Sequence, residues 1–269
     1  MQKTAQEISN KRFHVLDSFR GLAALAVVMF HMQIEGSNTR LSFFRHSDLF
    51  VELFFVLSGF VIAHSYGFRA NFNLYNFFIS RTFRLFPLHI VMLVVFIFIE
   101  VGKLVAYKYG LHFNHLPFTG KDAIDEILPN LFLLQSWTYL TNYMSFNIPS
   151  WSISIEYYMY FIFALLLYFK SSVRYILWCL ISILMFVLLY THNEMITLQV
   201  IKGLSSFFLG ALIYLVYKNT HQYFLVSKNI ATLIEAGILI LTVIMVTVNF
   251  EHKVIVANIF FALIIFIFA

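Results

Sequence analysis

Two side chains that could take part in catalysis, Arg20 and His31, lie on the first apolar segment of this 269-residue chain. An α-helix would place them about 20° apart around its axis and about 16 Å apart along it, so they share a face but cannot touch. Asp17 lies one turn before Arg20 and is expected to pair with it. The pattern predicts a helix face with a charged pair at one end and a possible general base, His31, near the other.

Two carboxylates are expected near the end of that face that carries His31. Glu52 opens the second apolar segment and Glu156 lies near the start of the fourth, and both segments are expected to run antiparallel to the first. Ser152, four residues before Glu156, shares its helix face. A histidine beside carboxylates and a hydroxyl has the components of an oriented general base. The alternative for each residue is a structural ion pair or a position at the membrane interface.

At the opposite end we expect a compact basic loop that contains Arg81 and Arg84, with Arg69 nearby. Guanidinium groups bind phosphate through charge-assisted hydrogen bonds, so such a loop suits a phosphate-bearing substrate. The alternative is the ordinary excess of Lys and Arg in cytoplasmic loops.

The elements that position these residues are predicted to be membrane-spanning helices. Of the chain, 61% is hydrophobic and 12% is charged, about half the charge of a soluble protein. A span needs about 20 mostly apolar residues. The sequence therefore predicts an all-α, polytopic transmembrane bundle with about eight spans, at 15–34, 49–67, 85–107, 150–169, 173–191, 196–217, 230–249 and 254–269.

A ninth apolar stretch, 127–140, is too short to span and is expected to be interfacial or re-entrant. With this choice and a cytoplasmic N-terminus, the inside segments carry Lys and Arg with Glu7 as their one acid, while most acidic residues fall outside. This distribution obeys the positive-inside rule. The sequence thus predicts a multi-pass protein of the inner (plasma) membrane whose N-terminus is cytoplasmic.

Other features narrow the class of protein. The net charge of +5 is spread through the loops, which argues against a nucleic-acid partner. We find no metal-ligand spacing, no nucleophile elbow and no glycine-rich phosphate loop, so we expect no metal and no bound cofactor.

Cys179 is expected to be a buried hydrophobe. The polar stretches are too short for a second domain, so we expect one domain over 1–269, incomplete at the C-terminus because the last apolar run stops at Ala269.

Three further predictions concern residues inside the spans. Ser58 and Gly59 are small and should allow close helix packing. His64 and His89 have no partner that the sequence suggests. Lys202 and Glu235 are expected to make no more than structural pairs.

Four segments together resemble the acyltransferase-3 family of membrane acyltransferases, which includes bacterial O-antigen and exopolysaccharide O-acetylases. They occur in the family's order, and the first fits its pattern of Arg, ten residues, His. The segments are LDSFRGLAALAVVMFH (Leu16 to His31), FFVLSGF (Phe54 to Phe60), RTFR (Arg81 to Arg84) and PSWSISIEYYMY (Pro149 to Tyr160).

The resemblance implies an acyltransferase that transfers groups other than amino-acyl groups. It would move an acyl group, acetyl foremost, from cytoplasmic acyl-CoA to a hydroxyl of an extracytoplasmic carbohydrate or glycolipid such as lipopolysaccharide. Membrane lipids would surround the protein. It implies that His31 is the catalytic base and that Arg81 and Arg84 bind acyl-CoA. Arg20 would join the acyl-CoA site, and Glu156 and Asp17 the catalytic group.

Two other classes stay open at this point. A proton-coupled transporter, or an exporter of a polysaccharide precursor, also places His, Glu and Arg within spans, although such proteins often show inverted repeats that this sequence lacks. A non-catalytic membrane scaffold would not need Arg20 and His31 on one face.

Overall fold

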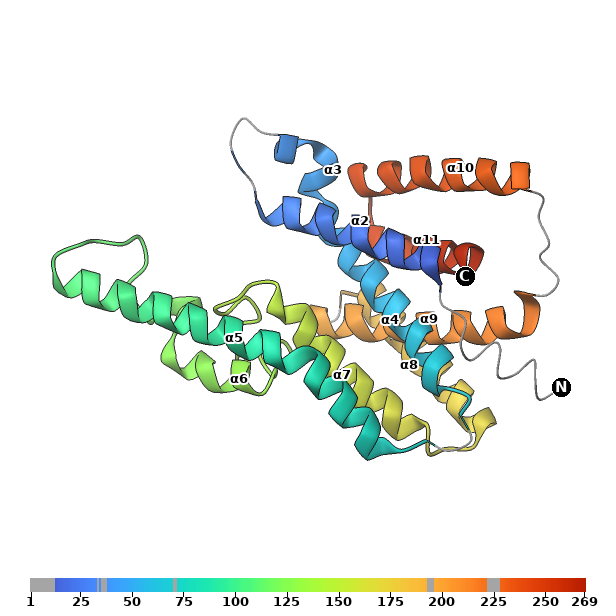
Figure 1. Cartoon of the computed structure of the whole chain (residues 1–269), viewed down its shortest axis with the longest axis horizontal. Helices are drawn as coiled ribbons and strands as arrows, with labels where there is room; N and C mark the ends of the chain where they lie inside the picture. The colour runs from blue at the N-terminus through green and yellow to red at the C-terminus, as the bar shows by residue number, and fades with distance from the viewer. Residues whose placement is uncertain (1–12, 33, 35–37, 70–71, 193–195, 222–227) are drawn as a thin grey trace. The chain divides into compact units, whose positions relative to one another are not determined.

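The structure, a computed structural model, describes residues 13–32, 34, 38–69, 72–192, 196–221 and 228–269; Glu7 lies outside them. Every regular element in this described part is helical (Figure 1), which confirms the all-α prediction there. The chain divides into two compact units. Unit 1 comprises 1–70, 175–190 and 205–269, and unit 2 comprises 71–174 and 191–204.

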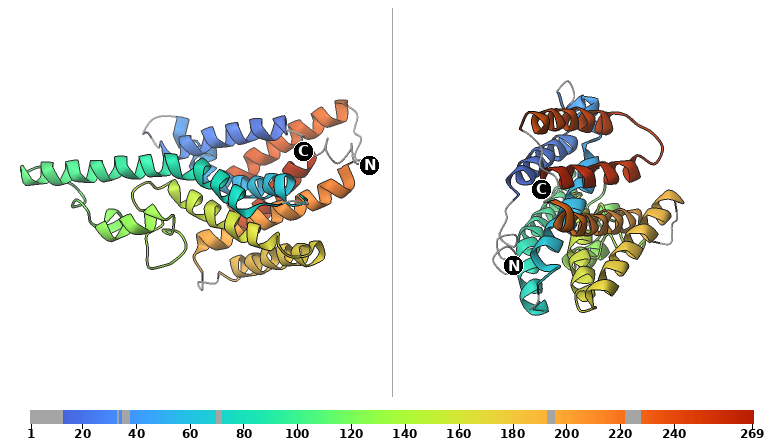
Figure 2. Two further views of the ribbon diagram at one scale, coloured as in Figure 1. Left: turned by 60° about the horizontal axis from the view of Figure 1, so that its bottom comes forward. Right: turned by 90° about the vertical axis from the view of Figure 1, so that its right-hand side faces the viewer.

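Unit 1 is built around α4, which is apolar all round and therefore buried. Figure 2 shows α2, α10 and α11 side by side in both of its views. The helices of unit 1 are α2 (His14–His31), α3 (Ser42–Arg45), α4 (Phe50–Tyr66), α10 (Lys228–Thr247), α11 (Lys253–Phe268), and most of α8 (Ser171–Tyr190) and α9 (Leu198–Thr220), with short 3₁₀ turns at Asn38–Arg40 and Ser47–Leu49.

Glycines bring the backbones of α4 and α9 together. A Cβ atom added to Gly59 would overlap the carbonyl oxygen of Phe207, and one added to Gly210 would overlap the carbonyl oxygen of Val56. Membrane helices gain van der Waals contact when small residues let their backbones approach. This confirms that Gly59 serves close helix packing.

Unit 2 is organised by α5, which packs on α6 and α7. The Asn73 side chain caps α5 by accepting a hydrogen bond from the backbone N–H of Asn76 at 2.9 Å. The helices of unit 2 are α5 (Leu74–Lys108), α6 (Ile127–Leu131), α7 (Ser150–Leu166) and the first residues of α8 and α9, with 3₁₀ turns at Gly120–Asp122 and Ile124–Glu126.

The length of α5 corrects one sequence prediction. We expected a basic loop up to Arg84 and a span from 85, but α5 begins at Leu74 and contains Arg81 and Arg84. No Gly or Pro interrupts the sequence between Asn73 and Phe86, so the capped helix continues unbroken into the apolar run. Its 35 residues would extend about 52 Å, against about 30 Å for the hydrocarbon core. Part of α5 must therefore lie beyond the hydrocarbon.

The stretch 127–140 forms no spanning helix, as predicted. It contains the five-residue α6 and then continues in turns. Side chains from α7 satisfy its backbone: Ser154 Oγ donates to the Leu133 carbonyl at 2.6 Å, and the Tyr158 hydroxyl donates to the Phe132 carbonyl at 2.9 Å. Non-helical backbone is tolerated at membrane depth when protein groups pair with it.

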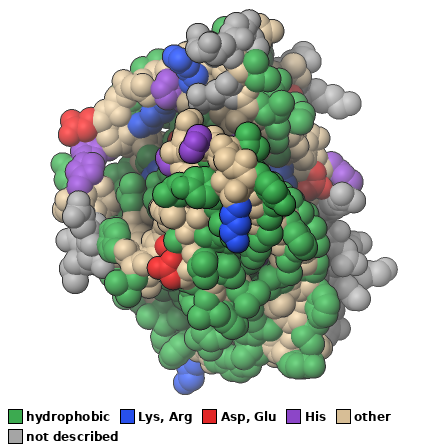
Figure 3. Space-filling view, turned by 90° about the vertical axis from the view of Figure 1, so that its left-hand side faces the viewer, with side chains coloured by type: hydrophobic (Ala, Val, Ile, Leu, Met, Phe, Trp, Pro, Cys, Tyr) green, Lys and Arg blue, Asp and Glu red, His purple; other side chains and the backbone are tan. Residues whose placement is uncertain are grey.

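Among the residues that the structure describes, four helical stretches are long and apolar enough to cross a membrane: Ser47–Tyr66, α5, α8 and α9. Thr232–Thr247 and Lys253–Phe268 are shorter apolar helices, while α2 and α7 have 18 and 17 residues. Hydrophobic side chains cover much of the face in Figure 3, with charged groups scattered between them. Extensive exposed apolar surface is expected where lipid replaces water. These features support a multi-pass membrane protein.

Candidate active site

The first helix carries three of the predicted site residues on one unbroken element. α2 runs without interruption from His14 to His31, so the shared face expected for Arg20 and His31 exists. Arg20 is half-buried, whereas Asp17 and His31 are exposed. The expected pairing of Asp17 with Arg20 stays a prediction.

The surroundings of His31 differ from those expected. Its ring lies 4.9 Å from the ring of Phe30, centroid to centroid. Asp48, in the 3₁₀ turn that packs against α2, lies within electrostatic range of the imidazole. The sequence predicts Glu52, and not Asp48, as the carboxylate near His31. A signal was present, because the short connection 32–49 must bring the end of α2 close to the start of α4.

Glu52 instead lies in the core of unit 1. It is 2% exposed, and Ser206 Oγ lies 2.8 Å from its Oε2. The same hydroxyl lies 2.8 Å from Oδ1 of the buried Asn258. The three residues belong to α4, α9 and α11, so they form a polar bridge between three helices. Pairing of this kind is what a carboxylate needs when it is removed from water.

In unit 2, Arg81 and Glu156 are linked through one tyrosine. The Arg81 guanidinium lies 5.6 Å from the ring centroids of both Phe77 and Tyr160. Tyr160 lies one turn after Glu156 on α7, and its hydroxyl donates to the Glu156 carboxylate. We expected Arg81 and Glu156 at opposite ends of the protein; the structure brings them into one cluster within unit 2. The reason is that Arg81 lies two turns inside α5 rather than in a loop before it.

The remaining predicted residues of unit 2 are less enclosed. Arg84, three residues after Arg81 on α5, is exposed. The Ser152 hydroxyl donates to the Pro149 carbonyl at 3.1 Å, so its hydrogen bond lies within the first turn of α7. An exposed arginine close to a half-buried one offers a cationic surface for an anionic group.

Other ionisable residues inside the helices have structural partners. His64 Nδ1 lies 3.0 Å from the Tyr214 hydroxyl, and His89 Nε2 lies 2.8 Å from the Asn130 carbonyl oxygen. Glu100 pairs with Lys103 and accepts a hydrogen bond from the Phe118 backbone N–H at 3.0 Å. The structure thus supplies the partners of His64 and His89 that the sequence did not reveal.

The candidate residues therefore form two groups. Asp17, Arg20 and His31 lie on α2 in unit 1, and Arg81, Arg84 and Glu156 lie in unit 2. Chemically, the first group offers an imidazole near a carboxylate, which is suited to proton transfer. The second offers two guanidinium groups, which are suited to binding phosphate.

Several known proteins are similar to this chain over more than half of its length. Acyltransferase MdmB of Streptomyces mycarofaciens is 33% identical over 178 residues, covering 62% of this chain and 43% of the relative. Protein 2 in the picA locus of Rhizobium radiobacter is 36% identical over 159 residues, covering 54% of this chain and 78% of the relative. Peptidoglycan O-acetyltransferase OatA of Listeria monocytogenes is 28% identical over 186 residues, covering 64% of this chain and 27% of the relative.

The chain thus spans less than half the length of two of these relatives. No solved structure gives a significant match. The model of the acyltransferase domain matches residues 13–269, nearly the whole sequence. The chain belongs to the acyltransferase-3 family of membrane acyltransferases.

Proposed function

We propose that this protein is a membrane-bound O-acyltransferase that moves an acyl group, acetyl foremost, from cytoplasmic acyl-CoA to a hydroxyl of an extracytoplasmic carbohydrate. The observation that carries the proposal is the continuous helix α2, with Arg20 and His31 on one face. Two of the relatives support the reaction type, because one is named an acyltransferase and the other a peptidoglycan O-acetyltransferase. The proposed topology has eight spans and a cytoplasmic N-terminus in the inner (plasma) membrane.

His31 acts as the general base in this proposal. The acceptor hydroxyl transfers its proton to His31 as its oxygen attacks the thioester carbonyl of acyl-CoA. The new carbon–oxygen ester bond forms, the carbon–sulfur bond breaks, and the proton passes to the departing CoA sulfur. A base within reach of the hydroxyl accelerates such a step by about 10²- to 10⁴-fold. Asp48, in the 3₁₀ turn that packs against α2, places a carboxylate near the imidazole at which the proton is held.

The arginines hold the donor. Arg81 and Arg84 pair with phosphate groups of CoA, and Arg20 contacts the donor on α2, about 16 Å from His31. Glu156 orients Arg81 through Tyr160 in this proposal, and Asp17 adds a carboxylate one turn from Arg20. The acceptor is a glycan of the cell envelope. Lipopolysaccharide and peptidoglycan are both candidates, the second because one relative is named for it.

Acyl transfer by the purified full chain tests the proposal. The protein in detergent is given acetyl-CoA labelled in the acetyl group together with envelope glycan fragments, and the products are identified by mass spectrometry. We expect a labelled O-acetyl ester on the glycan and release of CoA in equal amount. An acetyl-CoA pool that stays intact with every glycan, while the protein is folded and binds acetyl-CoA, would contradict the enzymatic assignment and favour a transporter or scaffold.

A further inference from the structure

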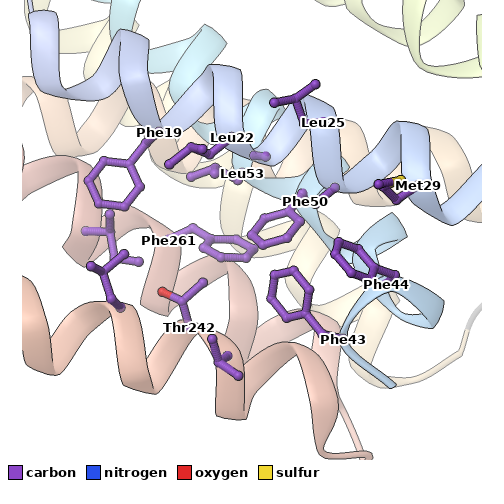
Figure 4. A pocket seen from close by; sticks show the side chains of 15 residues that line it. Phe19, Leu22, Leu25, Met29, Phe43, Phe44, Phe50, Leu53, Thr242 and Phe261 are labelled. Carbon is purple, nitrogen blue, oxygen red and sulfur yellow. The ribbon is translucent and has the colours of Figure 1, made fainter. Parts of the chain in front are cut away.

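An apolar pocket of about 390 Å³ lies within unit 1 (Figure 4). Side chains of α2, α3, α4, α10 and α11 line it, and the rings of Phe43, Phe50 and Phe261 lie together at its centre. Its volume falls in the range of sites for small organic ligands, about 300–1,000 Å³. None of the predicted catalytic or acyl-CoA-binding residues lines it.

The pocket is unsuited to water. Among the described residues that line it, Thr242 alone has a polar side chain, and its hydroxyl donates to the Ile238 carbonyl of the same helix at 2.7 Å. A buried water needs two to four polar partners. The lining therefore favours a hydrocarbon occupant, which would recover the dispersion contacts that an empty pocket loses.

The rim of the pocket identifies the source of that hydrocarbon. Leu22 and Leu25 of α2 are each 64% exposed, and Val243 of α10 is 48% exposed. In a membrane protein, exposed apolar side chains on such helices face lipid chains rather than water. We propose that this pocket binds a hydrocarbon chain of a bilayer phospholipid.

The position of the pocket around α2 separates it from the acyl-transfer site. Leu22, Ala26 and Met29 line the pocket at helical spacing. Arg20 and His31 lie about 160° and 180° around the helix from Leu22. An acyl group attacked beside His31 would thus occupy the opposite face of α2. The proposed phospholipid chain is a separate ligand from the donor, and this inference does not depend on the proposed function.

One wall of the pocket belongs to a helix that is tied to its neighbours. α3 supplies Phe43, and the Ser42 hydroxyl beside it donates to the Thr247 carbonyl at the end of α10, 3.4 Å away. Asn249 Nδ2 and His46 Nε2 approach to 3.2 Å and add a second link. These contacts hold the wall in place before any ligand binds. Preformed walls lower the ordering cost of binding.

Lipid retention by the purified full chain tests the proposal. The protein is washed extensively in detergent, and the bound phospholipid is extracted and quantified per chain by mass spectrometry. Ala26→Phe fills the pocket from α2. Val243→Trp covers its mouth from an exposed position and so spares the core. Leu241→Trp is the matched control, because it adds the same ring about half a turn around α10 from the pocket.

We expect the wild type and Leu241→Trp to retain phospholipid near one molecule per chain, and the two pocket variants to lose most of it. Size-exclusion profiles check that each variant is folded, and Val243→Trp decides the matter if Ala26→Phe fails to fold. Equal retention in Val243→Trp and Leu241→Trp would overturn the site. A wild-type extract without phospholipid, or with acyl-CoA or a polyprenyl-linked glycan in its place, would overturn the assigned ligand. Because no turnover is measured, failure here leaves the proposed acyl transfer untouched.

Discussion

Arg81 stacks its guanidinium against the ring of Tyr160, 5.6 Å from the ring centroid, and Tyr160 in turn donates to Glu156. One tyrosine thus connects an arginine on α5 with a carboxylate on α7. A cation held over an aromatic face, whose own hydroxyl is fixed by a hydrogen bond, keeps a defined direction. If Arg81 binds the CoA phosphates, Tyr160 and Glu156 set the geometry in which it does so.

We expect Arg81→Ala and Arg84→Ala each to weaken acyl-CoA binding by about tenfold, because each removes a charge-assisted hydrogen bond to phosphate. Charge reversal to Glu should weaken it further. Lys108→Ala, which removes a cation from the far end of α5, should leave the affinity unchanged. Calorimetric titration of the purified variants with acetyl-CoA gives the comparison. Unaltered affinity in both arginine variants would mean that these residues serve only the membrane topology.

His31→Ala should leave the protein folded and able to bind acyl-CoA but lower acyl transfer by about 10²-fold or more, since the general base is lost. His31→Gln retains much of the hydrogen bonding yet cannot take up a proton, so it should be nearly as inactive. His115→Gln, in the loop after α5, is the control and should transfer at the wild-type rate. Substantial turnover by His31→Gln would show that the histidine has a structural role instead.

Gly59→Ala should destabilise unit 1, because the new methyl group would overlap the Phe207 carbonyl of α9. Overpacking of this kind costs about 1–3 kcal/mol. Gly102→Ala on α5 is the matched control: a Cβ there meets no atom within 4 Å, so the change should be neutral or slightly stabilising. Thermal unfolding in detergent measures both. A wild-type Tm for Gly59→Ala would refute the close approach of α4 and α9.

The proposed topology predicts where a membrane-impermeant thiol reagent reacts. In a Cys179→Ser background, a cysteine at His115 should be labelled in intact cells, and a cysteine at Tyr75 should be labelled only after the membrane is opened. Both positions are exposed, so accessibility on the protein itself does not limit the reaction. The reverse pattern would invert the assigned orientation.

Glu126 should make stability depend on pH. Burial raises the pKa of Glu126 above its ordinary value of 4.5, and the charge of Asp125 adds to the effect, against the hydrogen bond from the Asn142 N–H. The folded state therefore holds the proton more tightly than the unfolded state. This contribution to stability is full below the ordinary pKa and is lost as pH rises through the raised one. The free energy of unfolding of the wild type and of Glu126→Gln, measured at several pH values across this window, should change with pH at different slopes. Identical slopes would exclude the effect.

The sequence predicts the helical elements well because apolar runs must fold as helices in a membrane. Gly59 was recognisable as a packing residue, and 127–140 was recognisable as too short to span. The sequence does not reveal the start of α5, because Arg81 and Arg84 come directly before the apolar run that begins at 85 and charged residues predict the boundary of a span. Charge ends a hydrocarbon span, but it does not end a helix capped at Asn73.

Side-chain partners were harder to predict, because they depend on contacts between distant segments. Ser206 is 154 residues from Glu52, and Asn130 is 41 residues from His89. Helical spacing predicts neighbours one turn away, such as Tyr160 beside Glu156. It does not reveal which separate helices meet.

The bridge from Glu52 to Ser206 and Asn258 has a consequence for biosynthesis. At about 5–20 residues per second, a ribosome takes roughly 8–30 s to advance the 154 residues from Glu52 to Ser206. During that interval α4 is synthesised but lacks both of these partners, and a carboxylate at membrane depth is costly. The insertion machinery must therefore protect α4 until α9 and α11 have been made, so the core of unit 1 is completed only after α11 is synthesised.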